Sequence, residues 1–335
     1  MTRTFCTLFD KNYLVQGVAL HASLRRHARD FRLYALCMDQ AAFAMLERMR
    51  SDTLIPLSVE ELVTPEVDAV RARTTHGQFC WVCQPLVCEH LLDRSGVDSV
   101  TYLESDSMFF SDPEALFEEL GERSVSLVPH NYSSEFDNTE TAGRFCVQFN
   151  AFRNDRRARA VLADWKQSCF RYDRSAPRAY PGQTCLDDWP ARFEGVAVIQ
   201  HRGAGVAPWN VRGYRLDAGN PPRVEGMPVV FYHYHQYGRL RSGHHELGSY
   251  PLTPGIIDAF YRPYALAIEK ARRDVRAIDP SFVHRREYPD HGTFLDLVRQ
   301  FSVPRANDYL EVVKRKLRGR YNVFPDSYFS SREDG

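Results

Sequence analysis

The sequence has no excess of charge of either sign. Its 335 residues contain 43 Lys and Arg and 43 Asp and Glu, so the formal net charge is zero. Proteins dedicated to binding nucleic acid carry a strong positive charge, so this balance predicts no nucleic-acid partner. Aromatic residues make up 13% of the chain, and Gly and Pro number only 19 each. This composition excludes an intrinsically disordered protein and predicts a folded one.

Long apolar segments are also missing. The chain has no uninterrupted apolar run of about 18 residues, which predicts no transmembrane helix. Its start, MTRTFCTLFDKNYLVQG, does not fit a signal peptide because Asp10 and Lys11 interrupt a short apolar run. The eight cysteines are scattered rather than spaced as a disulfide framework. Together these absences predict a cytoplasmic protein with reduced thiols.

Motifs that define several common enzyme classes are absent. The chain has no G-x-x-x-x-G-K-[ST] phosphate loop, no G-x-G-x-x-G opening a helix and no G-x-S-x-G turn. Kinase, dehydrogenase and esterase interpretations therefore lack their defining parts. Cys80, Cys83 and Cys88 contain one C-x-x-C pair, but no second pair completes a zinc site. Their spacing on a predicted helix favours packing in the core.

Apolar runs alternate with helical patterns along most of the chain, and this alternation predicts an α/β fold with a parallel sheet. After residue 175 the pattern loosens, and Pro, Gly, His and aromatic residues are interleaved through residue 240. We expect strands at 4–10, 31–39, 53–62, 97–110, 124–130 and 145–155, and helices at 14–28, 41–50, 78–94, 156–170 and 256–277.

The sharpest motif is YLESDSMFFSDP at 102–113, where an apolar strand delivers Glu104 and Asp106 to its carboxyl end. Ligands of open α/β sheets bind at this edge. Hard divalent cations prefer oxygen ligands and keep positions open for substrate phosphates, so the acidic pair suggests a metal–diphosphate site. The alternative is an ordinary polar turn, because acidic pairs are common in loops.

Four segments in order resemble glycosyltransferases of the GT-A fold, similar to the family 8-like and bacterial surface-polysaccharide enzymes. They are TLFDKNYLVQGVALHASL, YLESDSMFFSDPEALF, VQFNAFRND and GQTCLDDW. That family has Asp-x-Asp at the strand end, so Glu104 departs from the pattern while Asp106 matches its last aspartate. The resemblance implies a GT-A type nucleotide-sugar-binding mixed sheet flanked by helices over 1–250. A helical C-terminal extension with a basic tail would occupy 251–335.

The resemblance also implies an activity. The chain would be a metal-dependent, hexosyltransferase-like glycosyltransferase of polysaccharide biosynthesis that uses Mn²⁺ or Mg²⁺. It would move a sugar from a nucleotide diphosphate sugar to a glycan or lipid-linked acceptor. The basic tail, KRKLRGR, is typical of a solvated face and is also compatible with peripheral contact at the inner, anionic face of a membrane.

By the same resemblance, Thr7, Phe9, Asp10 and Tyr13 lie against the nucleotide base and ribose, although Tyr13 equally fits packing of the first helix. The segment VQFNAF brings polar residues into an apolar strand. The family uses an amide there to orient the donor sugar. Two residues supply such amides, and both also fit satisfied core positions: Gln148 and Asn150.

The segment GQTCLDDWP matches the family at Gln183, whereas Gly182 departs from its pattern. Asp187 and Asp188 are the neighbouring carboxylates. If transfer inverts the anomeric centre, one of them acts as general base on the acceptor hydroxyl. They equally fit an acidic pair that is stabilised at a helix start.

His233 and His235 alternate on one face of a predicted strand. In the resembled family a histidine of a comparable late strand is a further metal ligand, and His233 is the favoured candidate. Imidazole suits Mn²⁺ better than Mg²⁺. In the loop before this strand, Trp209 could stack on a sugar or simply pin the loop.

Two other functions stay open. A sugar-phosphate nucleotidyltransferase would need a Gly-rich amino-terminal loop with a following basic residue, which TLFDKNYLVQG lacks. A non-catalytic nucleotide-sugar-binding protein is compatible with the departures at Glu104 and Gly182. The sequence leaves open the donor base, sugar, acceptor, stereochemistry and oligomeric state.

Overall fold

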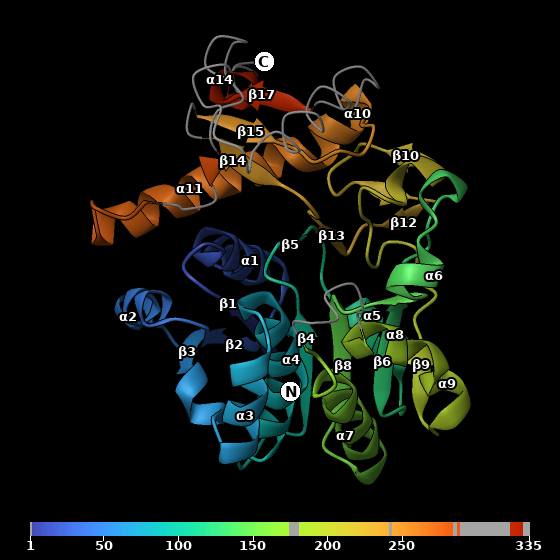
Figure 1. Ribbon diagram of the computed structural model, residues 1–335. Helices are drawn as coiled ribbons and strands as arrows, with labels where there is room; N and C mark the ends of the chain where they lie inside the picture. The colour runs from blue at the N-terminus through green and yellow to red at the C-terminus, as the bar shows by residue number, and fades with distance from the viewer. Residues whose placement is uncertain (1, 174–180, 241–242, 284–286, 289–321, 331–335) are drawn as a thin grey trace.

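A computed structural model describes residues 2–173, 181–240, 243–283, 287–288 and 322–330 (Figure 1). Its central sheet has eight strands in the order β3-β2-β1-β4-β8-β6-β7, with β9 also paired to β6. Four neighbours run parallel: β1 (Arg3–Phe9), β2 (Phe31–Cys37), β3 (Leu54–Ser58) and β4 (Ser99–Leu103). The remaining strands are β6 (Val125–Pro129), β7 (Phe145–Cys146), β8 (Phe149–Arg153) and β9 (Val196–Val198).

The sheet is mixed because β8 runs antiparallel to β4, and β6 runs antiparallel to β8. Helices cover both faces, and β1 explains why: Phe5 and Phe9 face one core, while Cys6 and Leu8 face the other. The first core packs under α1 (Leu14–His27), α2 (Gln40–Met49) and α5 (Glu114–Leu120). The second packs under α4 (His76–Leu92) and α7 (Arg156–Cys169).

Side-chain caps fix where these helices begin, since they satisfy backbone N–H groups that have no partner within the helix. Asp39 accepts a hydrogen bond from the backbone N of Ala42 at 2.7 Å, and Thr75 forms a capping box with Gln78 at the start of α4. The strand predicted over 97–110 breaks after β4 into a loop of Glu104, Ser105 and Asp106, and β5 (Ser107–Phe109) follows. The strand predicted over 145–155 is likewise divided, into β7 and β8, and each remaining predicted strand and helix has a counterpart.

Short elements join the main ones. They are η1 (Val59–Leu62), α3 (Pro65–Arg73), η2 (Ser134–Phe136), α6 (Thr139–Ala142), α8 (Pro181–Thr184), η3 (Cys185–Asp188), α9 (Trp189–Arg192), η4 (Val211–Gly213), β10 (Leu216–Asp217), β11 (Arg223–Val224), β12 (Met227–Pro228) and β13 (Phe231–His233).

The later part of the chain lies over α1 (Figure 1). It contains helices α10 (Pro254–Ile256), η5 (Ile257–Tyr261), α11 (Arg262–Ile278) and α14 (Asp326–Ser330). A four-stranded sheet accompanies them: β14 (Gly238–Leu240), β15 (His244–Glu246), β16 (Glu287–Tyr288) and β17 (Val323–Pro325). Because β15 pairs with β17, hydrogen bonds cross the predicted domain boundary at residue 250. The basic sequence KRKLRGR lies outside the described residues.

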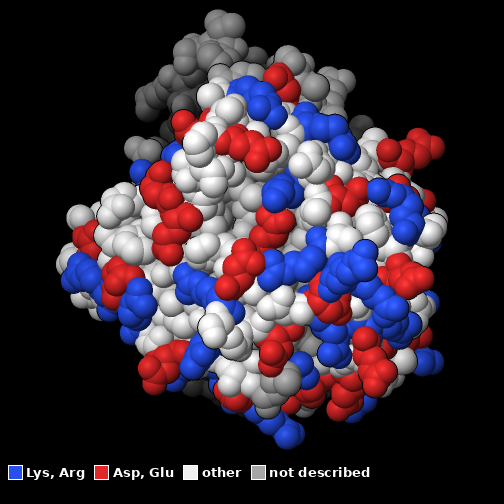
Figure 2. All heavy atoms as spheres, turned by 90° about the horizontal axis from the view of Figure 1, so that it is seen from below, with Lys and Arg blue, Asp and Glu red and all other residues white. Residues whose placement is uncertain are grey.

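Charged residues of both signs are interspersed over the face seen in Figure 2, in line with the zero net charge. Many form ion pairs across elements, such as Lys166–Glu89 at 2.9 Å and Arg159–Asp93 at 2.5 Å. No helix in the described part of the chain is long and apolar enough to cross a membrane. All eight cysteines carry free thiols, and Cys83 and Cys88 are buried in the second core.

Candidate active site

A cavity of about 660 Å³ opens at the carboxyl ends of β1 and β4. This is the edge at which open α/β sheets bind ligands. Eight of the predicted site residues line it: Phe9, Asp10, Tyr13, Glu104, Asp106, Gln183, Trp209 and His233.

Asp106 and His233 meet in this cavity because β5 pairs with β13. His233 lies opposite Ser107 in the ladder, and the backbone N of Tyr234 donates to the carbonyl of Asp106 at 2.8 Å. The Nε2 atom of His233 lies 3.1 Å from Oδ1 of Asp106. Burial alone would lower the pKa of His233, but the charge and hydrogen bond of Asp106 raise it well above its ordinary value. The long-range pairing of two short strands therefore builds the centre of the site.

Gln148 lies behind the imidazole of His233, whose Nδ1 is 3.0 Å from the amide oxygen Oε1. An amide oxygen only accepts, so Nδ1 donates its hydrogen, and Nε2 is the ring nitrogen that faces Asp106. Gly205 makes room for this amide: its φ is +67°, and a Cβ there would lie 2.3 Å from Nε2 of Gln148. Gln148 is thus fully buried and contacts the site through His233.

Glu104 lines the same cavity, but its carboxylate accepts a hydrogen bond from a side chain of helix α4. The amide Nε2 of Gln84 donates to Oε1 of Glu104 at 3.0 Å. Burial and, to a smaller extent, the charge of Asp106 raise the pKa of Glu104 to about 8. A carboxyl group with this pKa is mostly protonated at neutral pH, so a bound cation would have to displace its proton.

Asp106 and His233 fit a divalent cation such as Mn²⁺ that displaces the proton between them, because a carboxylate oxygen and an imidazole nitrogen face each other and the far ring nitrogen is fixed by an amide. Glu104 is a nearby carboxyl of the same wall. The described residues also contain a group of three side chains that could ligate a metal, outside this cavity, with ligand atoms within 4.8 Å of one another. It consists of His245, Glu269 and Asp326.

Asp10 and His76 form an ion pair at the cavity, with Nε2 of His76 3.2 Å from Oδ2 of Asp10. The hydrogen bond to Asp10 is the main reason why the pKa of His76 is raised to about 10. Burial alone would raise the pKa of Asp10, but hydrogen bonds from His76 and Asn12 hold it below its ordinary value. Both side chains are therefore charged at neutral pH.

Aromatic rings form much of the remaining wall. Trp209 is only 4% exposed, and its Nε1 donates to the carbonyl of His130 at 2.9 Å. The Trp209 ring contacts His233 edge-on, with 5.3 Å between ring centroids. Both observations favour a role in holding the site together. Trp81 and Tyr172 pack together at another part of the wall, with centroids 5.3 Å apart.

Gln183 lies at the cavity and ties two neighbouring segments together. Its Nε2 donates to the carbonyl of Ala142 at 2.6 Å, and its Oε1 accepts from the backbone N of Val147. The structure does not bring Asp187 or Asp188 to the cavity wall. Asp187 accepts from the backbone N of Arg144 at 2.7 Å, and Asp188 is exposed and pairs with Arg192 at 3.1 Å.

Thr7 and Asn150 do not line the cavity either. Both are fully buried within the sheet. The amide nitrogen of Asn150 donates to the carbonyl of Ser126 at 3.4 Å, whereas its amide oxygen is buried without a hydrogen-bond partner among the described residues.

Among the described residues that line the cavity, none is Lys or Arg. Three lining residues are acidic, namely Asp10, Glu104 and Asp106. The positive charge that histidine provides is already paired at the wall, since His76 faces Asp10 and His233 faces Asp106. These pairs offer no net positive charge to an anionic ligand unless a cation binds as well.

Several lining residues were not singled out from the sequence. A clue in the sequence could have identified Gln84, because its amide next to Pro85 interrupts an apolar stretch of the predicted helix. Tyr250 and His76 had no such clue, because their place at the cavity depends on contacts between distant segments.

The comparisons with known proteins bear on the fold of the chain. No protein-family model matches the chain. Two uncharacterized proteins of Bacillus subtilis (strain 168) are similar to it, each 25% identical. The likeness to YfnD spans 287 residues, 83% of this chain and 92% of YfnD. The likeness to YfnF spans 295 residues, 84% of this chain and 97% of YfnF.

Among solved structures, the chain is similar to the galactosyltransferase LgtC in complex with donor and acceptor sugar analogs. The TM-score is 0.50 at 13% sequence identity, and the match covers 80% of this chain and 95% of that chain. The predicted mixed sheet flanked by helices is confirmed. The chain has the GT-A fold of glycosyltransferases.

Proposed function

We propose that this protein is a metal-dependent, hexosyltransferase-like glycosyltransferase that uses a nucleotide diphosphate sugar as donor. Its acceptor is a glycan or a lipid-linked glycan of a polysaccharide pathway. The fold supports the reaction class, since LgtC of the same fold was solved with donor and acceptor sugar analogs. The observation that carries the proposal is the Asp106–His233 pair inside the cavity.

The charge of the cavity supports the metal dependence. A nucleotide diphosphate is strongly anionic, whereas the described wall contains no Lys or Arg, and its His76 and His233 are each paired with an aspartate. A cation held by Asp106 and His233 would act as a Lewis acid that neutralises charge on the departing diphosphate. Mn²⁺ suits the imidazole ligand better than Mg²⁺ does.

The chain's own residues would share the remaining work. Phe9, Asp10 and Tyr13 line the end of the cavity next to β1 and would hold the base and ribose. Gln148 fixes the ring of His233 through Nδ1. Gln183 faces the cavity from α8 and would contact the donor sugar.

Lipid-linked acceptors would be met at a membrane. We propose that the basic sequence KRKLRGR, outside the described residues, contacts its anionic cytoplasmic face. Binding of the protein to vesicles of anionic lipid, and its release from them at high salt, would support this contact.

The test is thermal unfolding with UDP, GDP and CDP, each with Mn²⁺, with Mg²⁺ and with EDTA. A ligand of the folded state adds about 2.7 kcal/mol of stability at a hundredfold excess over its Kd. We expect one nucleotide to raise the Tm only when the metal is present, and Asp106→Asn to abolish this rise. Asp188→Asn is the matched control, because its carboxylate lies on the surface away from the cavity.

Two results would count against the proposal. If a nucleotide still raised the Tm in EDTA or in Asp106→Asn, nucleotide binding would not depend on the metal. The second result is that a nucleotide stabilises the protein but no nucleotide sugar is cleaved, with or without added acceptors. This result would instead identify a non-catalytic nucleotide-sugar-binding protein.

A further inference from the structure

The side chain of Asn322 holds the turn that carries Tyr250. Its amide Nδ2 donates to the carbonyl of Tyr250 at 2.6 Å and to that of Gly248 at 3.2 Å. The backbone N of Leu247 donates to the carbonyl of Asn322 at 2.8 Å. Asn322 is only 9% exposed. Three hydrogen bonds therefore tie a late segment of the chain to this turn.

Tyr250 in turn forms part of the cavity wall. It packs against a small apolar cluster of Cys146, Ala207 and Trp209. Its ring meets that of Phe136 edge-on, with centroids 5.0 Å apart. This cluster is separate from the two main cores. Tyr250 is one of the partly buried residues that pack against it, so its position bears on how well Cys146 is covered.

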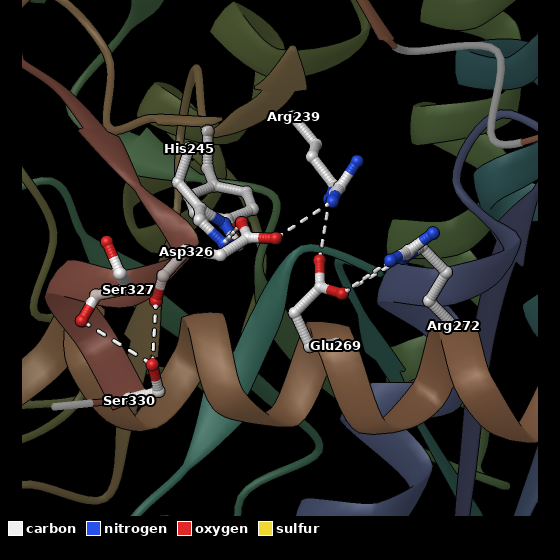
Figure 3. A network of polar contacts seen from close by, with 8 residues as sticks. Arg239, His245, Glu269, Arg272, Asp326, Ser327 and Ser330 are labelled. Atoms are coloured by element: carbon white, nitrogen blue, oxygen red, sulfur yellow. Dashed lines mark hydrogen bonds and ion pairs between the residues drawn. The ribbon is translucent and has the colours of Figure 1, made fainter. Parts of the chain in front are cut away.

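The segment that carries Asn322 is anchored firmly (Figure 3). Its strand β17 pairs with β15, and Asp326 of α14 accepts from Arg239 at 3.1 Å. Nε2 of His245 lies 2.8 Å from Oδ1 of Asp326. The guanidinium of Arg262 donates to the carbonyls of Tyr328 and Phe329 at 2.7 and 2.8 Å.

This network balances its own charges. Arg239 donates to Glu269 at 2.6 Å as well as to Asp326, and Arg272 donates to Glu269 at 2.8 Å. Burial lowers the pKa of His245, so its ring is neutral at neutral pH. Among the described residues of this network, two guanidinium groups thus face two carboxylates. The network is an anchor for the segment.

We propose that Asn322 is a positioning residue that sets Tyr250 against the binding cavity, so that the segment Asn322–Ser330 supports the cavity wall through Tyr250. The inference goes beyond the proposed transfer reaction and holds for any ligand of the cavity. Substitution of Asn322 should loosen Tyr250 and uncover Cys146 while the two main cores stay closed.

Alkylation of thiols by iodoacetamide, followed residue by residue with mass spectrometry, tests this without nucleotide or metal. Asn322→Asp keeps the size of the side chain but sets a carboxylate against two carbonyl oxygens, and Asn322→Ala removes the donors only. We expect the labelling rate of Cys146 to rise about tenfold in both variants, because two hydrogen bonds that oppose local opening are lost. Cys83 and Cys88, in the second core, serve as internal controls.

Ser330→Ala is the matched control, since the Ser330 hydroxyl bonds only within α14 and should leave Cys146 protected. Tyr250→Ala should uncover Cys146 by itself, and adding an Asn322 substitution to it should change little. Unchanged protection of Cys146 in both Asn322 variants would overturn the proposal. Equal labelling of Cys83, Cys88 and Cys146 would also overturn it, because the segment would then support the whole fold. Neither outcome bears on nucleotide binding.

Discussion

The amide oxygen of Gln148 lies 3.0 Å from Nδ1 of His233, the ring nitrogen remote from Asp106. This arrangement gives Nδ1 a fixed acceptor and leaves Nε2 as the nitrogen that faces the carboxylate. Partners of this kind commonly decide how well a histidine binds a metal. Gln148 was expected at the donor sugar, whereas the structure gives it a contact with the histidine.

Gln148→Leu should therefore lower the affinity for Mn²⁺ by about 10–100-fold, because Nδ1 loses its acceptor and the ring loses its orientation. Titration of the protein with Mn²⁺ by calorimetry measures the change. Gln200→Leu serves as the control, since Gln200 is an exposed amide away from the cavity. Equal Mn²⁺ affinity in Gln148→Leu and the wild type would remove Gln148 from the support of the site.

The ion pair of Asp10 and His76 gives a pH dependence with a definite sign. The pKa of His76 is raised from 6.5 to about 10 in the folded protein. Its contribution to stability is fully present below pH 6.5 and is lost as the pH rises toward 10. Because the imidazole is more than half exposed, that contribution should stay below about 1 kcal/mol.

Titration of the histidine resonances by NMR tests this pair directly. We expect His76 to remain protonated at pH 8, and Asp10→Asn to return its pKa toward 6.5. His21, whose pKa burial lowers to about 4, should be unaffected in the same spectra. A midpoint near 6.5 for His76 in the wild type would mean that the pair does not form in solution.

Trp209 should matter for stability as well as for the cavity. Trp209→Ala removes a buried indole and should cost about 3–5 kcal/mol of the free energy of unfolding. Trp209→Phe keeps a ring but loses the hydrogen bond to the carbonyl of His130, which costs about 1 kcal/mol. Denaturation in urea measures both. Trp81 is partly exposed, so Trp81→Phe is the comparison. If Trp209→Phe lowered the free energy of unfolding no more than Trp81→Phe does, the buried position of Trp209 would be contradicted.

The two carboxylates after Gln183 allow the prediction of a general base to be tested. Asp188 pairs with Arg192 at the surface, so Asp188→Ala should change stability by less than about 1 kcal/mol and leave transfer activity intact. Asp187→Ala should weaken substrate binding by loosening Arg144 and the preceding segment. Transfer assays with saturating donor separate the two effects. A loss of kcat by orders of magnitude in Asp188→Ala would restore it as a base.

Most of the fold was predictable because it rests on local patterns. The near-continuous apolar runs of β1 and β2 mark strands that are buried on both faces, and the acidic pair marks the end of β4. The antiparallel direction of β8 could not be read in this way. Strand direction depends on how the connection from β6 returns to the sheet, and side-chain alternation is the same for both directions.

The site was predictable where its residues follow a strand of the central sheet, as Asp10 and Asp106 do. Resemblance added His233 and Gln183, which local patterns alone would not select. The polar residues of the strand interiors, Thr7 and Asn150, could not be separated from site residues in advance. A buried polar side chain in a strand can face a ligand or a neighbouring carbonyl, and only the packed sheet decides which.

The contact between Asn322 and Tyr250 has a consequence for biosynthesis. Every described residue of the cavity wall precedes Asn322 in the sequence. The ribosome therefore adds all of these residues before it adds the one that positions Tyr250. A domain generally folds as a unit during synthesis, so the wall gains its final form only after this residue leaves the ribosome. A message cut short before codon 322 would yield a chain that lacks the hydrogen bonds positioning Tyr250 at the cavity.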